Sequence, residues 1–132
     1  MEGEWQRRDP VRPWWSGTWY GARLRASHEG GGSSFATVEL DARRYWPLGD
    51  QVALAGRARA AHASSGTPYH QRFQFGGVYS VRGYDFAYLS GALGAANLVQ
   101  GNLELRVPLL DRDAALPRVT GLLFLDTGQC WD

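Results

Sequence analysis

The stretch "GGVYSVRGYDFAYLSG", residues 76–91, has features that do not suit any regular secondary structure. It is too apolar for an ordinary surface loop, and its glycines disfavour both a strand and a helix. A single basic residue, Arg82, lies near its centre. The stretch belongs to a longer connection that we expect at residues 64–96. Ordered connections beyond about 12 to 15 residues are uncommon in compact domains and usually serve a function. The aromatic content of this one argues against disorder.

The segments on both sides of this loop alternate polar and apolar residues with a period of two, and no helical stripe is sustained anywhere. This alternation predicts strands at residues 17–28, 34–46, 51–62, 97–109 and 118–128. Short glycine-bearing connections such as "PLGD", residues 47–50, are typical of hairpins. The predicted fold is therefore all-β, an antiparallel meander of about five strands.

Each predicted strand has one apolar face of small and aliphatic residues and one charged face. The charged face carries both signs: Arg23, Arg25, Glu39, Asp41, Arg43, Arg57, Arg59, Glu104, Arg106 and Asp126. Aromatic residues gather near the strand ends, at Trp14, Trp15, Tyr45, Trp46 and Trp131. A soluble sheet with one face on a core fits the alternation. A transmembrane barrel with a charged interior fits it too, and the mixed charges, modest apolar side chains and terminal aromatics favour this second interpretation.

Composition limits the functions that this chain can have. At 132 residues it is one domain at most, and no apolar run approaches the roughly 18 residues of a spanning helix. The net charge of +1 gives no general attraction to nucleic acid. The single cysteine excludes an internal disulfide. The first ten residues lack the apolar core of a signal peptide, so we expect either a cytoplasmic protein or a missing start.

No enzyme motif is present. The sequence has no G-x-S-x-G, no H-E-x-x-H and no P-loop, because "GGGSS" lacks the required lysine. His28, His62 and His70 lack the spacing of metal ligands on one element, and we expect Cys130 to be a small strand-end residue. We therefore expect no catalytic residue, metal or cofactor. A soluble lipocalin-like binding barrel remains an alternative, although it would need a bulkier interior and no loop of this length.

The tetrapeptide Val81, Arg82, Gly83 and Tyr84 resembles the motif of the lumenal loop in the BamA/TamA superfamily of outer-membrane barrels, the bacterial surface antigen family. Three further segments resemble the family in the family's order. "RDPVRPWWSGTWYGARL" looks like a periplasmic turn with its rising strand, "NLELRVPLL" like the strand after the loop, and "LFLDTGQCWD" like the next strand. The resemblance covers essentially residues 9–132.

The resemblance implies a sixteen-stranded barrel in the bacterial outer membrane, preceded by periplasmic POTRA domains. Its long sixth extracellular loop would fold back into the lumen. We therefore expect residues 1–132 to be a partial outer-membrane β-barrel domain, from a fragment or a truncated reading frame, since POTRA domains and a final aromatic-terminated strand are not seen in it.

The resemblance also names partners for the buried arginine. The family's matching positions place Glu104 and Asp126 beside Arg82, and strand parity independently puts both carboxylates on the polar face. Gly76, Gly77 and Gly83 would let the loop turn sharply and approach the barrel wall. Aromatic side chains would pack the returning loop, and we expect Phe75 and Tyr79 to support it together with the glycines.

The implied function is insertion of other barrel proteins into the outer membrane. The alternative within the superfamily is a two-partner secretion pore that exports an unfolded passenger protein. Neither activity involves covalent chemistry or a cofactor. The implied partners are outer-membrane lipids, client barrel proteins or a secreted passenger, and POTRA domains or other periplasmic partners in the full-length protein; nucleic acid is not among them.

Overall fold

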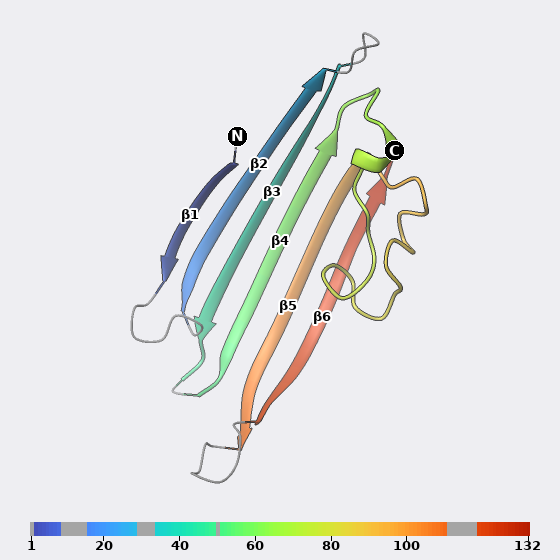
Figure 1. Ribbon diagram of the computed structural model, residues 1–132. Coiled ribbons are helices and arrows are strands. Elements are labelled where there is room, and N and C mark those ends of the chain that lie inside the picture. The colour runs from blue at the N-terminus through green and yellow to red at the C-terminus, as the bar shows by residue number, and fades with distance from the viewer. Residues whose placement is uncertain (1, 9–15, 29–33, 50, 111–118) are drawn as a thin grey trace.

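The computed structural model describes residues 2–8, 16–28, 34–49, 51–110 and 119–132, and shows one open antiparallel sheet (Figure 1). The strands are β1 (Glu2–Arg8), β2 (Gly17–His28), β3 (Ser34–Pro47), β4 (Ala53–Ala63), β5 (Asn97–Leu110) and β6 (Val119–Trp131). Each strand pairs with its neighbour in sequence, in the order β1-β2-β3-β4-β5-β6. The predicted all-β antiparallel meander is confirmed.

The five predicted strands are all present, with small shifts at their ends. β4 begins at Ala53, two residues late, because the preceding residues form a turn in which the Leu48 N–H donates to the Val52 carbonyl at 2.8 Å. β6 continues past the predicted end at Gly128 to Trp131, since its last residues pair with the first residues of β5. The predicted start of this strand, residue 118, lies outside the described residues.

The strand β1 was not predicted from the sequence. Its segment "EGEWQRR" has no run of alternating apolar residues to mark it as a strand. It pairs along its whole length with β2, from Glu2 opposite Arg23 to Arg8 opposite Gly17. Backbone pairing along the edge of β2 therefore defines this strand, and a pattern of side chains does not.

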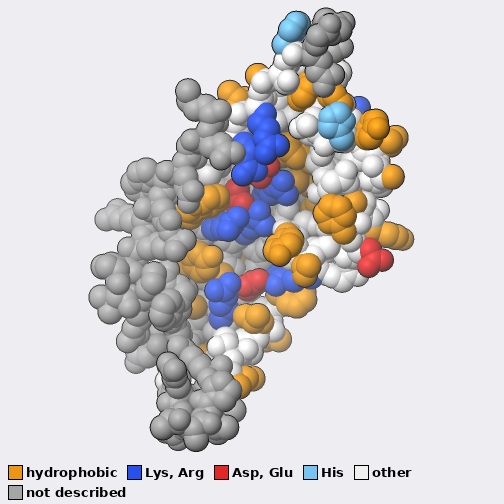
Figure 2. Space-filling model, viewed as in Figure 1, with side chains coloured by type: hydrophobic (Ala, Val, Ile, Leu, Met, Phe, Trp, Pro, Cys, Tyr) orange, Lys and Arg blue, Asp and Glu red, His pale blue; other side chains and the backbone are white. Residues whose placement is uncertain are grey.

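The strand register confirms that the charged residues predicted for one face share it, whereas Arg44 of β3 lies on the other face. Arg23 lies opposite Glu39, Asp41 opposite Arg59, and Asn102 opposite Asp126, so the polar positions of β2 to β6 follow one another across the sheet. Figure 2 shows this polar face with its basic side chains in a column. We call the two sides of the sheet the polar face and the apolar face.

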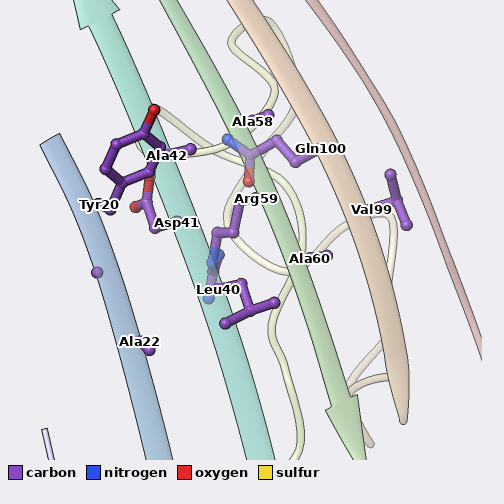
Figure 3. Close-up of a pocket in the computed structure, with 11 residues that line it drawn as sticks. Tyr20, Ala22, Leu40, Asp41, Ala42, Ala58, Arg59, Ala60, Val99 and Gln100 are labelled. Carbon is purple, nitrogen blue, oxygen red and sulfur yellow. The ribbon is translucent and has the colours of Figure 1, made fainter. Parts of the chain in front are cut away.

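No described part of the chain covers the apolar face. Large side chains on it stay exposed: Tyr20, Leu24, Leu40, Val99, Leu103, Leu123 and Leu125. Between some of these, alanines leave a shallow groove, which Figure 3 shows around Ala42, Ala58 and Ala60 with Tyr20 and Leu40 beside them. Such a surface needs an apolar environment in place of water.

The long connection between β4 and β5, residues 64–96, lies against the polar face instead of extending away from the sheet (Figure 1). It contains one 3-10 turn, Tyr69–Gln71, and an antiparallel bridge between Phe73 and Ala95. Its Phe75 and Val81 pack on Leu98 of β5 and form a small buried core. Within the described residues, no helix is long and apolar enough to cross a membrane.

Candidate functional site

Arg82, in the long loop, is bound by two carboxylates on the polar face of the sheet. Its Nε donates to Asp126 Oδ2 at 2.7 Å and its Nη2 donates to Asp126 Oδ1 at 2.7 Å, which is the bidentate fork that guanidinium and carboxylate favour. Its Nη1 donates to Glu104 Oε1 at 2.6 Å. The backbone N–H of Arg82 adds a fourth bond, to Asp126 Oδ2 at 2.9 Å. The structure thus brings together the three residues that the sequence singled out.

We call the cluster of Arg82, Asp126 and Glu104 the arginine clamp. Its surroundings keep these side chains charged. The Asp126 side chain is only 2% exposed, so its charge depends on the donors around it. Hydrogen bonds to Asp126, and secondarily to Glu104, raise the pKa of Arg82 above its usual value, which keeps the guanidinium protonated. The guanidinium also lies 3.9 Å from the centroid of the Phe124 ring, a cation–π contact.

Three side chains beside the clamp hold the loop through its backbone carbonyls, and the sequence did not reveal this role. Arg57 Nη1 donates to the carbonyl of Tyr79 at 3.0 Å, and Asn102 Nδ2 donates to the carbonyl of Ser80 at 2.7 Å. Gln100, 2% exposed, donates to the same two carbonyls at 3.4 and 3.3 Å. Parity places all three on the polar face, but a backbone acceptor leaves no trace in a sequence.

Apolar packing anchors the start of the loop. The Phe75 ring is 1% exposed and sits over Gly128 of β6, where a Cβ would come within 2.5 Å of the ring and 2.6 Å of the Val99 carbonyl. Gly128 therefore makes room for the ring. Val81 of the tetrapeptide packs in the same core, and Cys130 lies at its border with its thiol 3.3 Å from the Leu89 carbonyl. Burying a phenyl ring in this way stabilises the docked loop by about 1.5–3 kcal/mol.

The loop glycines were expected to let the loop approach the wall of the sheet, and the structure shows a different role for them. Gly76 and Gly77 have φ of +119° and +91°, which favour glycine, but they approach the backbone of the loop itself and not the wall of the sheet. A Cβ on Gly76 would lie 2.6 Å from the Asp85 carbonyl. Gly83 also has a positive φ, +97°, yet nothing lies within 4 Å of the position its Cβ would take. The glycines thus let the loop fold compactly on itself.

The aromatic residues of the loop divide into buried and exposed groups. Phe75 packs as expected, whereas the Tyr79 ring is exposed and supports the loop only through its carbonyl, contrary to the role expected for it. Tyr84 of the tetrapeptide stacks on Tyr88, with ring centroids 5.8 Å apart. Both rings remain exposed on the open side of the loop.

The aromatic residues expected near the strand ends also fall into two groups, one on each face of the sheet. The register puts Tyr45 on the polar face, where the Arg106 guanidinium lies 5.6 Å from its ring, while Trp46 and Trp131 belong to the apolar face. Trp14 and Trp15 lie outside the described residues. Aromatics at the strand ends therefore do not form one girdle on a single face.

The chemistry of this site is electrostatic and structural. Every carboxylate in it is bound to a protonated guanidinium, which suits fixing a loop better than transferring a proton. Among the described residues, no group of three or more His, Cys, Asp or Glu is arranged to hold a metal ion. The site holds a long polar-face loop in one position.

Comparison with known proteins identifies one family. The family model described as the Omp85 superfamily domain matches residues 13–132, nearly the whole chain and all five predicted strands. A search of curated proteins found no match.

Proposed function

This chain belongs to the Omp85 superfamily, and from that premise we propose that it forms part of a BamA/TamA-type barrel that inserts other barrel proteins into the bacterial outer membrane. The observation that carries the proposal is the arginine clamp. A loop bound to the polar face through Arg82, Asp126 and Glu104 matches the lumenal loop that the tetrapeptide implies.

The open sheet supports a role as part of a larger wall. Of the described strands, β1 and β6 each pair on one side only. In the hydrocarbon core of a membrane, unpaired backbone N–H and C=O groups each cost several kcal/mol, so only closed barrels cross it with strands. With the apolar face toward lipid and the polar face toward a lumen, the sheet would supply one segment of such a barrel. Its partners would be outer-membrane lipids, client barrel proteins, and POTRA domains or other periplasmic proteins.

The docked loop gives this segment a mechanical function and no covalent one. The clamp binds the loop to β5 and β6, and the hydrogen bond from Arg57 to the Tyr79 carbonyl binds it to β4. We propose that this fixed loop braces the wall and narrows the lumen while client strands associate with the barrel. No cofactor and no catalytic residue enter the proposal.

Export of an unfolded passenger through a two-partner secretion pore is the second candidate. The same tetrapeptide and the "LSGALG" segment after it are compatible with that branch. A lipocalin-like soluble barrel is less well supported, because the polar face carries ion pairs where such a barrel would line an apolar ligand cavity.

Chimeric barrels test the proposal and separate the two branches. Residues 13–132 would replace the matching segment in a BamA-type assembly factor and, separately, in a two-partner secretion pore. We expect growth and normal outer-membrane protein levels from the first chimera, and their loss when it carries Arg82→Ala. Rescue of secretion alone would favour the second candidate. An assembly chimera that reaches the membrane intact but does not support assembly would refute the proposal.

A further inference from the structure

Arg44 of β3 places a positive charge on the apolar face of the sheet. It lies opposite Thr18 of β2 on one side and Gly56 of β4 on the other, and its side chain is exposed. Its guanidinium lies 5.3 Å from the centroid of the Trp46 ring. The register of β1 places Arg7 in the same row, opposite Thr18. A cation on a face made of aliphatic and small residues calls for an anion.

The described strands supply no carboxylate to this face. The register puts every acidic residue of these strands on the polar face: Glu2, Glu4, Glu39, Asp41, Glu104 and Asp126. Within the described residues, the guanidinium of Arg44 meets an aromatic ring and no acidic side chain. Because arginine stays protonated in proteins, its counter-ion must come from outside this part of the chain.

Arg44 lies close to one end of its strand. It is three residues before Pro47, the last residue of β3, which is roughly 10 Å along the strand. β3 has 14 residues, whereas roughly 9 to 11 suffice to cross a membrane, so its end reaches the level of the lipid headgroups. Trp46 lies between Arg44 and this end, and tryptophan is enriched at the membrane interface. The cation is therefore near the boundary of the apolar layer.

A glycine on the next strand holds the Trp46 ring beside Arg44. A Cβ on Gly56 would lie 2.9 Å from the ring, so the absence of a side chain there makes room for the ring to lie over β4. Thr18, on the other side of Arg44, adds a hydroxyl donor to the same face. The site thus combines a guanidinium, a hydroxyl group and an indole ring.

An apolar groove begins directly beyond Arg44. The shallow groove between Ala42, Ala58 and Ala60, which we call the alanine groove, has a volume of about 680 Å³ (Figure 3). Ala42 is two residues further from the strand end than Arg44, and Ala58 lies opposite Ala42. Along β3, the cation therefore comes first and the groove follows toward the middle of the strand. A phospholipid has its phosphate and its acyl chain in the same order.

We propose that Arg44, with Thr18 and Trp46 beside it, binds the phosphate of an anionic phospholipid whose acyl chain lies in the alanine groove. A guanidinium matches phosphate oxygens with two parallel hydrogen bonds. The inference rests on the proposed function, because that function places the apolar face in lipid. It adds one specific lipid contact, in the leaflet next to the turn at residues 48–52.

Native mass spectrometry of the whole chain in dodecyl maltoside micelles tests the inference, with dipalmitoyl phosphatidylglycerol as the added lipid. Arg44→Gln should lower the binding constant of the lipid about fivefold, in line with the loss of one ion pair. Arg44→Lys should keep most of the binding, because an ammonium also binds phosphate as a point charge. Ala58→Leu should weaken binding by filling the groove. Arg25→Gln is the matched control, since it removes the same charge from the polar face of β2.

Four outcomes would overturn the inference. Equal loss of binding in Arg44→Gln and Arg25→Gln would show attraction to net charge alone. Equal binding of dipalmitoylglycerol, which has no phosphate, would show that the acyl chains suffice. Displacement of the lipid by inorganic phosphate at the same concentration would show a site for free anions. Unchanged binding in Ala58→Leu would show that the acyl chain does not lie in the groove.

The fold of each variant is checked by cleavage of the long loop with chymotrypsin. Unchanged cleavage in Arg44→Gln shows that the polar face and its loop are intact. If that variant is cleaved faster, the comparison of Ala58→Leu with Arg25→Gln decides the matter, because both keep Arg44.

The chimera experiment is independent of this one. An assembly chimera that works, together with lipid binding that ignores Arg44, would refute only the lipid site. Lipid binding that depends on Arg44, with a chimera that reaches the membrane and fails to assemble clients, would refute only the proposed function. The chain would then keep a lipid-facing wall whose wider role differs.

Discussion

Arg82→Ala should release the long loop from the sheet. The substitution removes three side-chain hydrogen bonds, two to Asp126 and one to Glu104. Glu104 keeps Arg106 as a partner, at 2.8 Å. Asp126, 2% exposed, would keep Asn102 at 2.8 Å as its side-chain donor, with no cation beside it. The main cost therefore falls on the buried charge of Asp126.

The size of the effect follows from this burial. Removing one partner of a buried ion pair typically costs about 3–5 kcal/mol, compared with about 0–1 for an exposed pair. Each 1.4 kcal/mol is a tenfold change in an equilibrium, so the open form of the loop should become roughly 100-fold to several thousand-fold more populated. Arg82→Lys should recover only part of this, because an ammonium cannot form the fork to Asp126.

Limited proteolysis with chymotrypsin in detergent measures this opening. Its sites at Tyr79, Tyr84 and Phe86 remain in every variant, whereas a trypsin site would disappear with Arg82. Cleavage tracks the population of the opened loop when opening and closing are fast. Arg44→Ala, on the apolar face, is the control. Equal cleavage of Arg82→Ala and the control would refute the reasoning, as would full protection of Arg82→Lys.

Three further predictions concern the same chain, two of them in detergent and one without it. Gly128→Ala should destabilise the docked loop by about 1–3 kcal/mol, because its Cβ would lie 2.5 Å from the Phe75 ring; chymotrypsin cleavage checks this against Gly101→Ala, whose Cβ meets its nearest atom at 3.4 Å. Gly76→Ala should increase cleavage more than Gly83→Ala, since both have positive φ but only the first would bring a Cβ to 2.6 Å from a carbonyl; equal cleavage would contradict it. Without detergent the chain should aggregate, because its apolar face is uncovered; a sharp monomer peak in size-exclusion chromatography would contradict this.

Periodicity predicted those parts of the structure that depend on which side a residue faces. A period of two assigns each strand residue to one of two faces, so Glu104 and Asp126 were placed on the polar face before any pairing was known. The register between strands then confirmed that the charged residues predicted for this face share it, from Arg23 on β2 to Asp126 on β6. Among the described strands, only β1 was not predicted by periodicity, because its sequence has no alternation of apolar and polar residues.

The contacts of the loop depend on information that periodicity does not contain. Resemblance to a family pointed to Arg82, but the bonds from Asn102 and Gln100 end on backbone carbonyls, which every residue has. The place of Gly128 under Phe75 depends on how far the loop folds back, a distance that follows from the whole chain. A sequence pattern therefore predicted which polar residues face the loop, and it could not predict what each one binds.

The arginine clamp is linked to the rest of the polar face through residues that bind more than one group. Glu104 is bound by Arg82 of the clamp and by Arg106 of β5, and Arg57 joins Asp41 to the Tyr79 carbonyl of the loop. A substitution of Arg106 or Asp41 should therefore also change how firmly the loop is held. Coupling between two sites is reciprocal, so a ligand that binds the polar face more tightly when the loop is docked would stabilise the docked loop by the same factor.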